Sequence, residues 1–179
     1  MELTKASEYR QSIRKYVAEK SIPEEDIRAL IKFAQEAPSW KNFQSGRYFV
    51  AASPEKMQEV REKCLPSFNA KSTADASAYI ITTFEKGQSG FNLKGEKDTE
   101  LGDEWGAYDL GLQNAYLILK AAELGLDTLI MGIRDEKALR ECFEIPESQQ
   151  IVAVIAVGYR DQTPDRRPRK ELEEIARFF

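Results

Sequence analysis

The sequence predicts one α+β domain spanning residues 1–179. Helix-like and strand-like segments alternate irregularly along the chain, and no internal repeat is visible. A length of 179 residues suits one hydrophobic core. The unbroken apolar run at 151–157 is typical of a central strand. Such a strand belongs in a sheet that helices pack against, which agrees with the α+β class.

The individual elements follow from local patterns. Segments rich in β-branched, aliphatic and aromatic residues predict strands at 47–52, 78–84, 127–133 and 151–157. Apolar periodicity predicts helices at 23–37, 53–64, 106–125 and 135–143. Pro23, Ser53 and Asp135 suit helix starts, and Pro38 ends the first of these helices.

The helix at 106–125 is apolar on more than one side. One face carries Leu110, Leu117, Ala121 and Leu124, and another carries Leu112, Ala115, Leu119 and Ala122. A domain of this size cannot cover every side of such a helix, so part of it is expected at a subunit interface. The preceding segment, residues 85–105, has four glycines and many charges, which predicts a mobile loop that covers a ligand.

Composition excludes several classes of function. The net charge of −4, with no basic stripe along a helix, argues against a nucleic-acid partner. No apolar run approaches the ~20 residues of a membrane span, and the first residues lack a signal-peptide core. Cys64 and Cys142 lack CxxC spacing, so we expect reduced thiols and a cytoplasmic protein.

The chain has no histidine, which removes the usual zinc ligand, the Ser-His-Asp triad and the commonest general base. The acidic residues of 85–105 follow no metal-binding pattern, so no metal site is expected. An enzyme of this composition would depend on a bound cofactor.

Two arginine clusters are unusual in an acidic chain. Arg10, Ser12 and Arg14 alternate near one end, and Arg167 and Arg169 lie in the run 166–170 near the other. In an extended segment the first three would face one ligand, and arginine forks with a hydroxyl suit a phosphate. Solvated surface charge is the alternative. No glycine-rich nucleotide motif is present, so side chains would bind any phosphate.

A polar-aromatic loop follows the first predicted long helix. Asn42 and Gln44 carry amides that suit the edge of a heteroaromatic ring, while Trp40 and Phe43 would stack on such a ring or fill the core.

At this point the chain resembles the FMN-dependent nitroreductases in several ordered motifs. They are an Arg-x-Ser-x-Arg segment at 10–14, Ala-Pro-Ser-x-x-Asn-x-Gln at 37–44, Phe-Asn-x-Lys at 68–71 before Asp-Ala-Ser at 75–77, a residue–glycine pair at 131–132 after a long helix, Gly-Tyr at 158–159, and Arg-Pro-Arg at 167–169. The resemblance implies a central mixed β-sheet flanked by helices, with the long helix at a homodimer interface.

The resemblance also implies roles for individual residues. Arg10, Ser12, Arg14, Arg167 and Arg169 would hold the FMN phosphate and the pyrimidine edge of the flavin, and Asn69 would bond the ring. Pro38, Ser39, Trp40 and Asn42 would reach across from the other subunit of a homodimer, and Gln44 would also bind the cofactor. The backbone of Gly132, after Met131, would lie near flavin N5.

Two positions depart from the family pattern. Lysine is common in the family three positions after the asparagine, where this chain has Ser72, while Lys71 comes one place early. A cation near that edge raises the flavin potential, so either Lys71 substitutes or the flavin is harder to reduce. Met131 replaces a frequent acidic residue.

The resemblance implies an oxidoreductase that passes hydride from NAD(P)H through flavin N5 to nitroaromatic, quinone or related acceptors by a ping-pong scheme. Two alternatives stay open. One is a flavin-binding protein of the same fold that fragments or stores flavin or reduces one metabolite. The other is a cofactor-free homodimeric interaction module whose arginines bind acidic or phosphorylated groups.

Overall fold

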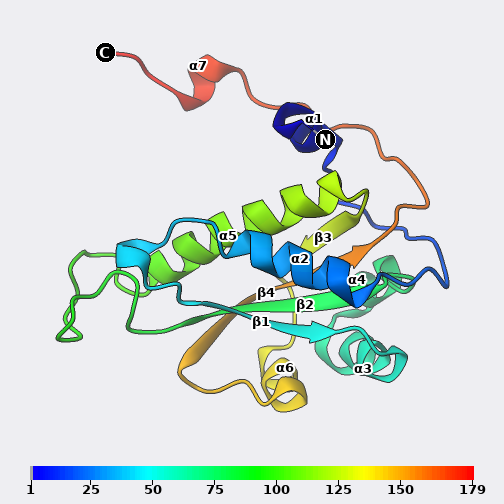
Figure 1. The fold of residues 1–179 in the computed structure, drawn as a ribbon, viewed down its shortest axis with the longest axis horizontal. Helices are drawn as coiled ribbons and strands as arrows, with labels where there is room; N and C mark the ends of the chain where they lie inside the picture. Colours follow the sequence, from blue (N-terminus) through cyan, green and yellow to red (C-terminus); the bar gives the residue numbers. More distant parts are fainter. Residues whose placement is uncertain (1) are drawn as a thin grey trace.

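The computed structural model describes residues 2–179 and has a four-stranded sheet between two layers of helices (Figure 1). The strands are β1 (Gly46–Ala51), β2 (Ala78–Glu85), β3 (Asp127–Met131) and β4 (Gln149–Gly158), in the order β1-β2-β4-β3. Each neighbouring pair is antiparallel. The α+β prediction is confirmed, but the four strands form an antiparallel sheet and not the mixed sheet that was expected. Within residues 2–179, parallel pairing is confined to an isolated bridge between Ser12 and Thr128, beside β3.

The central strands bury both of their faces. In β2, Tyr79 and Ile81 belong to the core on one side of the sheet, and Ala78 and Ile80 belong to the core on the other. This alternation is what the two-residue period of a strand requires. A sheet buried on both faces accounts for the continuous apolar run predicted to be a central strand, which is β4.

Helices α2 (Glu24–Ala34) and α5 (Glu104–Glu123) cover one face of the sheet, and α1 (Leu3–Tyr9) packs on α5. Leu30 of α2 and Leu117 and Ala121 of α5 are buried together against the sheet. The second apolar face of α5 is only partly covered, because Leu112, Ala115 and Leu119 remain half-exposed.

The opposite face is covered by α3 (Pro54–Glu59), the π-helical turn η2 (Val60–Cys64), α4 (Ser67–Ser72) and α6 (Glu136–Phe143). Two predicted caps are confirmed. Ser53 Oγ accepts a hydrogen bond from Lys56 N (3.2 Å), and Asp135 Oδ1 accepts one from Ala138 N (2.9 Å).

The segment 85–105 extends beyond the N-terminal end of α5 (Figure 1). Its turns are held by hydrogen bonds: Gly87 N donates to Asp103 Oδ1 (2.6 Å), and Asn92 Oδ1 accepts from Lys94 N (2.8 Å) and Glu96 N (3.0 Å). The segment is therefore organised into turns, and its mobility stays a prediction.

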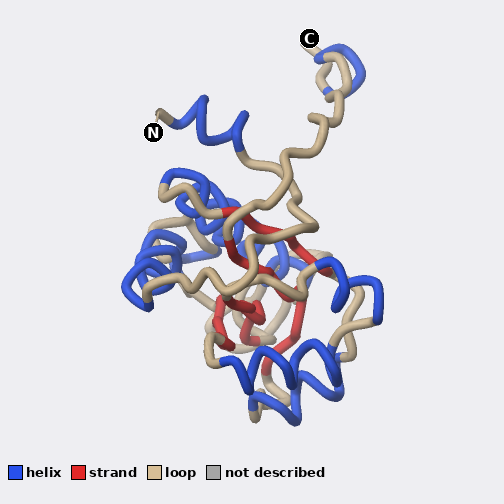
Figure 2. Tube along the Cα trace, turned by 90° about the vertical axis from the view of Figure 1, so that its right-hand side faces the viewer, coloured by secondary structure: helices blue, strands red, loops and turns tan. Residues whose placement is uncertain are grey.

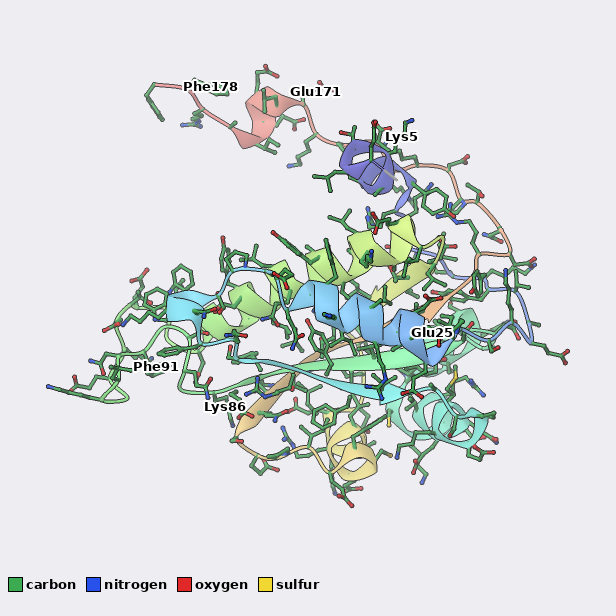
Figure 3. All side chains as sticks on the ribbon, in the orientation of Figure 1. Lys5, Glu25, Lys86, Phe91, Glu171 and Phe178 are labelled. Atoms are coloured by element: carbon green, nitrogen blue, oxygen red, sulfur yellow. The ribbon has the colours of Figure 1, made fainter. Side chains whose placement is uncertain are left out.

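Both ends of the chain project from the same side of the domain (Figure 2). After β4 the chain passes α1 and ends in the short helix α7 (Leu172–Ile175), with Phe178 directed away from the domain (Figure 3). Among residues 2–179, no helix combines the length and apolarity needed to cross a bilayer.

Candidate functional site

The two arginine clusters meet in one pocket, although they come from opposite ends of the sequence. A pocket of about 690 Å³ is lined by Arg10, Gln11, Ser12, Arg14 and residues 164–169, which include Arg166, Arg167 and Arg169. The tertiary fold therefore assembles a strongly cationic cavity on an acidic protein.

The N-terminal wall of this pocket is extended, as predicted. Ile13 N donates to Thr128 O (3.1 Å), Ser12 pairs with Thr128, and the Ile13 side chain is fully buried. Because adjacent side chains in an extended segment point in opposite directions, burial of Ile13 turns Ser12 and Arg14 outward.

The charges in the pocket repel one another. The pKa of Arg10 is lowered, first by partial burial and then by the positive charges of Arg169 and Arg166. A bound anion would remove this repulsion and accept charge-assisted hydrogen bonds from the guanidinium groups.

A second group of predicted residues lies at the far end of β3. Asn69 Nδ2 donates to Ile133 O (2.9 Å), which places α4 next to the Met131–Gly132 pair. The Met131 side chain is buried in the core, so its backbone alone can face a ligand. Gly132 is exposed, and a Cβ built on it meets nothing within 4 Å.

The two groups are separated by the length of β3. From Thr128, beside the arginine pocket, to Gly132 the strand advances about 13 Å at ~3.3 Å per residue. The arrangement suits an elongated ligand that has an anionic end and an uncharged end.

Lys71 and Ser72 differ in the hydrogen bonding and exposure of their side chains. Ser72 Oγ donates to Phe68 O (2.7 Å) within its own helix, whereas Lys71 is exposed one position earlier. Lys71 therefore supplies the exposed cation of this helix.

The loop 38–44 is an ordered and strained segment. Lys41, Asn42 and Gln44 have positive φ angles of 46°, 57° and 50°, a conformation that costs non-glycine residues of order 1–3 kcal/mol each. The short helix η1 (Trp40–Asn42) is anchored because Trp40 N donates to Asp109 Oδ2 (2.9 Å), and Gln44 N donates to Ser39 Oγ (3.0 Å). Pro38, Asn42 and Gln44 are exposed, as expected for ligand-binding groups.

Trp40 combines packing with an unsatisfied donor. Its ring lies 4.8 Å from that of Trp105, and its Nε1 is buried without a hydrogen-bond partner in the described part of the chain. Such buried donors are rare, which marks this loop as a place where another group completes the structure.

This loop does not reach the arginine pocket of its own chain. It is anchored at Asp109 in the first half of α5, whereas Thr128 follows the end of that helix. From Asp109 to Glu123, its last residue, the helix advances about 21 Å at ~1.5 Å per residue, and Figure 1 shows the two regions at opposite ends of α5. The structure thus brings the arginines together and sets Asn69 with Gly132, but leaves residues 38–44 apart.

Two positioning residues were missed by the sequence analysis. Asp109 is buried and also accepts a hydrogen bond from Ser89 Oγ (2.7 Å). Asp127 is buried at the start of β3, where it binds Arg160. An acidic residue inside an apolar pattern was the available signal in both cases, because buried carboxylates need partners.

Comparisons with known proteins agree on one family. A model described as "Nitroreductase family" matches residues 8–159. An Archaeoglobus fulgidus protein provisionally named NADH dehydrogenase/NAD(P)H nitroreductase is 29% identical over 161 residues, covering 87% of this chain and 84% of that protein.

Two solved structures share the fold. A provisionally named NAD(P)H:FMN oxidoreductase from Staphylococcus epidermidis has a TM-score of 0.88 at 21% identity, covering 99% of this chain and 96% of that one. A provisionally named nitroreductase from Exiguobacterium sibiricum, solved in complex with FMN, has a TM-score of 0.85 at 22% identity. The match covers 100% of this chain and 98% of that one.

Proposed function

Because the chain belongs to the nitroreductase family, we propose that it is an FMN-dependent oxidoreductase that takes reducing equivalents from NAD(P)H and delivers them to nitroaromatic, quinone or related acceptors in a ping-pong cycle. The observation that carries the proposal is the convergence of Arg10, Arg14, Arg167 and Arg169 on one pocket.

The residues present fit FMN at both of its ends. The arginines and the Ser12 hydroxyl would hold the phosphate. Partial burial and then the charges of Arg169 and Arg166 lower the pKa of Arg10, and a bound anion would offset the charge repulsion. Asn69, the backbone of Met131 and Gly132, and Lys71 would face the ring. Bound FMN supplies the hydride-accepting and hydride-donating chemistry at N5.

The protein's own residues would bind and orient the flavin and leave space for its ring. Gly132 leaves open space at the end of β3, where a side chain would occupy the volume of a ring. No histidine is available as a proton donor, so protons for the reduced acceptor would come from solvent.

We further propose that a homodimer completes each site. The loop 38–44 has the strain and unsatisfied donor of a binding segment. It is anchored at Asp109, however, about 21 Å along α5 from the helix end near which the arginine pocket lies. A two-fold partner would supply its Pro38, Ser39, Trp40, Asn42 and Gln44 to the arginines of the first chain.

Uncovered apolar surface supports this assembly. A pocket of about 390 Å³ between α1, α2 and α5 is lined by Leu3, Phe33, Tyr116 and Leu119 among others. In the C-terminal segment, Ile175 is 69% exposed and Phe178 is 85% exposed. Surfaces of this kind mark association sites in monomeric structures.

The proposal is tested on the purified protein. It predicts a yellow preparation that absorbs near ~450 nm, as flavins do, and steady consumption of NADH or NADPH when a nitroaromatic or quinone is supplied. A colourless protein that does not take up added FMN would favour the cofactor-free module. A yellow protein that oxidises neither nicotinamide nucleotide would favour a flavin-binding protein with another activity.

A further inference from the structure

Two free thiols are in contact on the side of the sheet that faces α3 and α6. Cys64 Sγ lies 3.8 Å from Cys142 Sγ, although the residues are 78 positions apart in the sequence. Cys64 ends η2 and Cys142 lies in α6, and these two elements pack against each other. Neither thiol has a part in the proposed flavin site.

The two sulfurs differ in access to solvent. Cys64 is fully buried, and burial, followed by its hydrogen bond to Cys142, raises the pKa of its thiol to about 12. Cys142 is only partly buried. A small oxidant from solvent therefore meets the Cys142 sulfur first.

Charged side chains of both signs lie beside Cys142. Lys56 Nζ donates to the Cys142 carbonyl oxygen and to Glu59 (2.8 Å), and Lys63 Nζ donates to Glu59 (3.0 Å). Hydrogen bonds from Lys56, from Lys63 and from the Cys142 side chain lower the pKa of Glu59 to about 2. The Cys142 thiol therefore borders a surface cluster of two ammonium groups and one carboxylate, on the solvent side of the cysteine pair.

We propose that Cys64 and Cys142 form a peroxide-sensitive dithiol that closes to an intramolecular disulfide. The Cys142 thiolate attacks a hydroperoxide, the O–O bond breaks, and Cys142 becomes a sulfenic acid, while the departing hydroxide or alkoxide takes a proton from solvent and leaves as water or an alcohol. The Cys64 sulfur then attacks the Cys142 sulfur, and the departing hydroxide takes the Cys64 proton as water. The two sulfurs lose two electrons in total, and the peroxide gains them.

The disulfide would join two segments that border the end of β3. The Cys64 carbonyl oxygen accepts a hydrogen bond from Asp135 N (2.8 Å), and Asp135 follows the segment 132–134 at the end of β3. A cross-link between residues 64 and 142 also closes a long loop, which restricts the unfolded chain and stabilises the folded one.

The test is hydrogen peroxide titration of the full-length protein, followed by thiol counting after denaturation and intact-mass measurement. The expected result is loss of both thiols together, a mass lower by two hydrogen atoms, no intermolecular cross-link, and an unfolding midpoint raised by several degrees. Dithiothreitol should reverse all of these changes.

Two single variants separate the roles of the sulfurs. In Cys64→Ser, Cys142 should accumulate as a sulfenic acid that a dimedone probe labels. In Cys142→Ser, Cys64 should stay reduced at the same peroxide dose because it is buried. Oxidation of Cys142 to the sulfinic acid in the unmutated protein without disulfide formation would overturn the proposal, as would retention of both thiols. None of these readouts depends on flavin binding.

Discussion

Arg160 binds the buried carboxylate of Asp127 with both its backbone and its side chain. Arg160 N lies 2.9 Å from Asp127 Oδ2, and Arg160 Nε lies 2.8 Å from Asp127 Oδ1. The same guanidinium donates to Tyr9 O (3.2 Å) and stacks over the Tyr9 ring. The pair therefore holds the residue before Arg10 and the start of the C-terminal tail against the first residue of β3.

We expect Asp127→Asn to destabilise the protein by about 3–5 kcal/mol, because it leaves the guanidinium of Arg160 buried beside a neutral amide. Only 13% of the Arg160 side chain and 3% of the Asp127 side chain are exposed. Urea unfolding measures the change. Glu24→Gln, which breaks the exposed pair with Arg28, is the control and should cost at most about 0.5 kcal/mol. A loss that small for Asp127→Asn would contradict the assigned role.

Arg169→Ala should weaken FMN binding by about ten- to a hundredfold, because a charge-assisted bond to phosphate contributes roughly 1.5–3 kcal/mol. Binding of riboflavin, which has the same ring without the phosphate, should change little. Fluorescence titration with both ligands measures the difference. Arg28→Ala removes an arginine on an exposed face of α2 and should leave both affinities unchanged. Equal losses for FMN and riboflavin would place Arg169 away from the phosphate.

Gly132→Ala separates folding from cofactor binding. A Cβ at position 132 meets no atom within 4 Å of the chain, so stability without flavin should be unchanged or slightly higher. A ring packed on Gly132 would be displaced, which weakens FMN binding by about five- to a hundredfold if overpacking costs roughly 1–3 kcal/mol. Gly111→Ala in α5 also adds a Cβ into open space and is the matched control. Unaltered FMN affinity in Gly132→Ala would exclude a ring at this position.

Mixed dimers test whether two chains build each site. If Arg169 and Asn42 in one site come from different chains, pairing an Arg169→Ala chain with an Asn42→Ala chain restores one intact site per dimer and places both changes in the other. Flavin bound by purified mixed dimers should exceed that of either variant homodimer at the same FMN concentration. Pairing a doubly substituted chain with an unmodified chain should yield no intact site. If the doubly substituted pairing keeps one intact site and the Arg169→Ala/Asn42→Ala pairing keeps none, one chain supplies both residues of a site.

The dimer should depend on the half-exposed face of α5. Leu119→Asp places a charge in the apolar groove formed with Leu3, Phe33 and Tyr116, and it should shift sedimentation from dimer to monomer or unfolded chain. Leu117→Asp should prevent folding altogether, because Leu117 is fully buried within a single chain. A Leu119→Asp protein that stays dimeric at micromolar concentration would contradict the proposed interface.

Local patterns predicted much of this fold because strong signals marked its long elements. The four strands and the helices α2, α5 and α6 follow from periodicity, and the caps at Ser53 and Asp135 follow from local hydrogen bonding. The short helices α1, η1, α4 and α7 were missed, because helices of three to seven residues hardly show a period and are stabilised by tertiary contacts.

The candidate site was only partly accessible to sequence reasoning. The alternation of Arg10, Ser12 and Arg14 indicated an extended segment, but nothing in the sequence shows that the chain's two ends meet beside Thr128. The roles of Asp109 and Asp127 also depend on partners 69 and 33 positions away. Contacts at such distances are properties of the folded topology, and local propensity carries no information about them.

The walls of the arginine pocket come from two segments far apart in the sequence, residues 10–14 and 164–169, so the pocket exists only while both segments are docked. An anion bound between them would contribute its binding free energy to keeping both segments in place. Occupancy of the pocket and protection of these segments from hydrogen exchange would then rise and fall together.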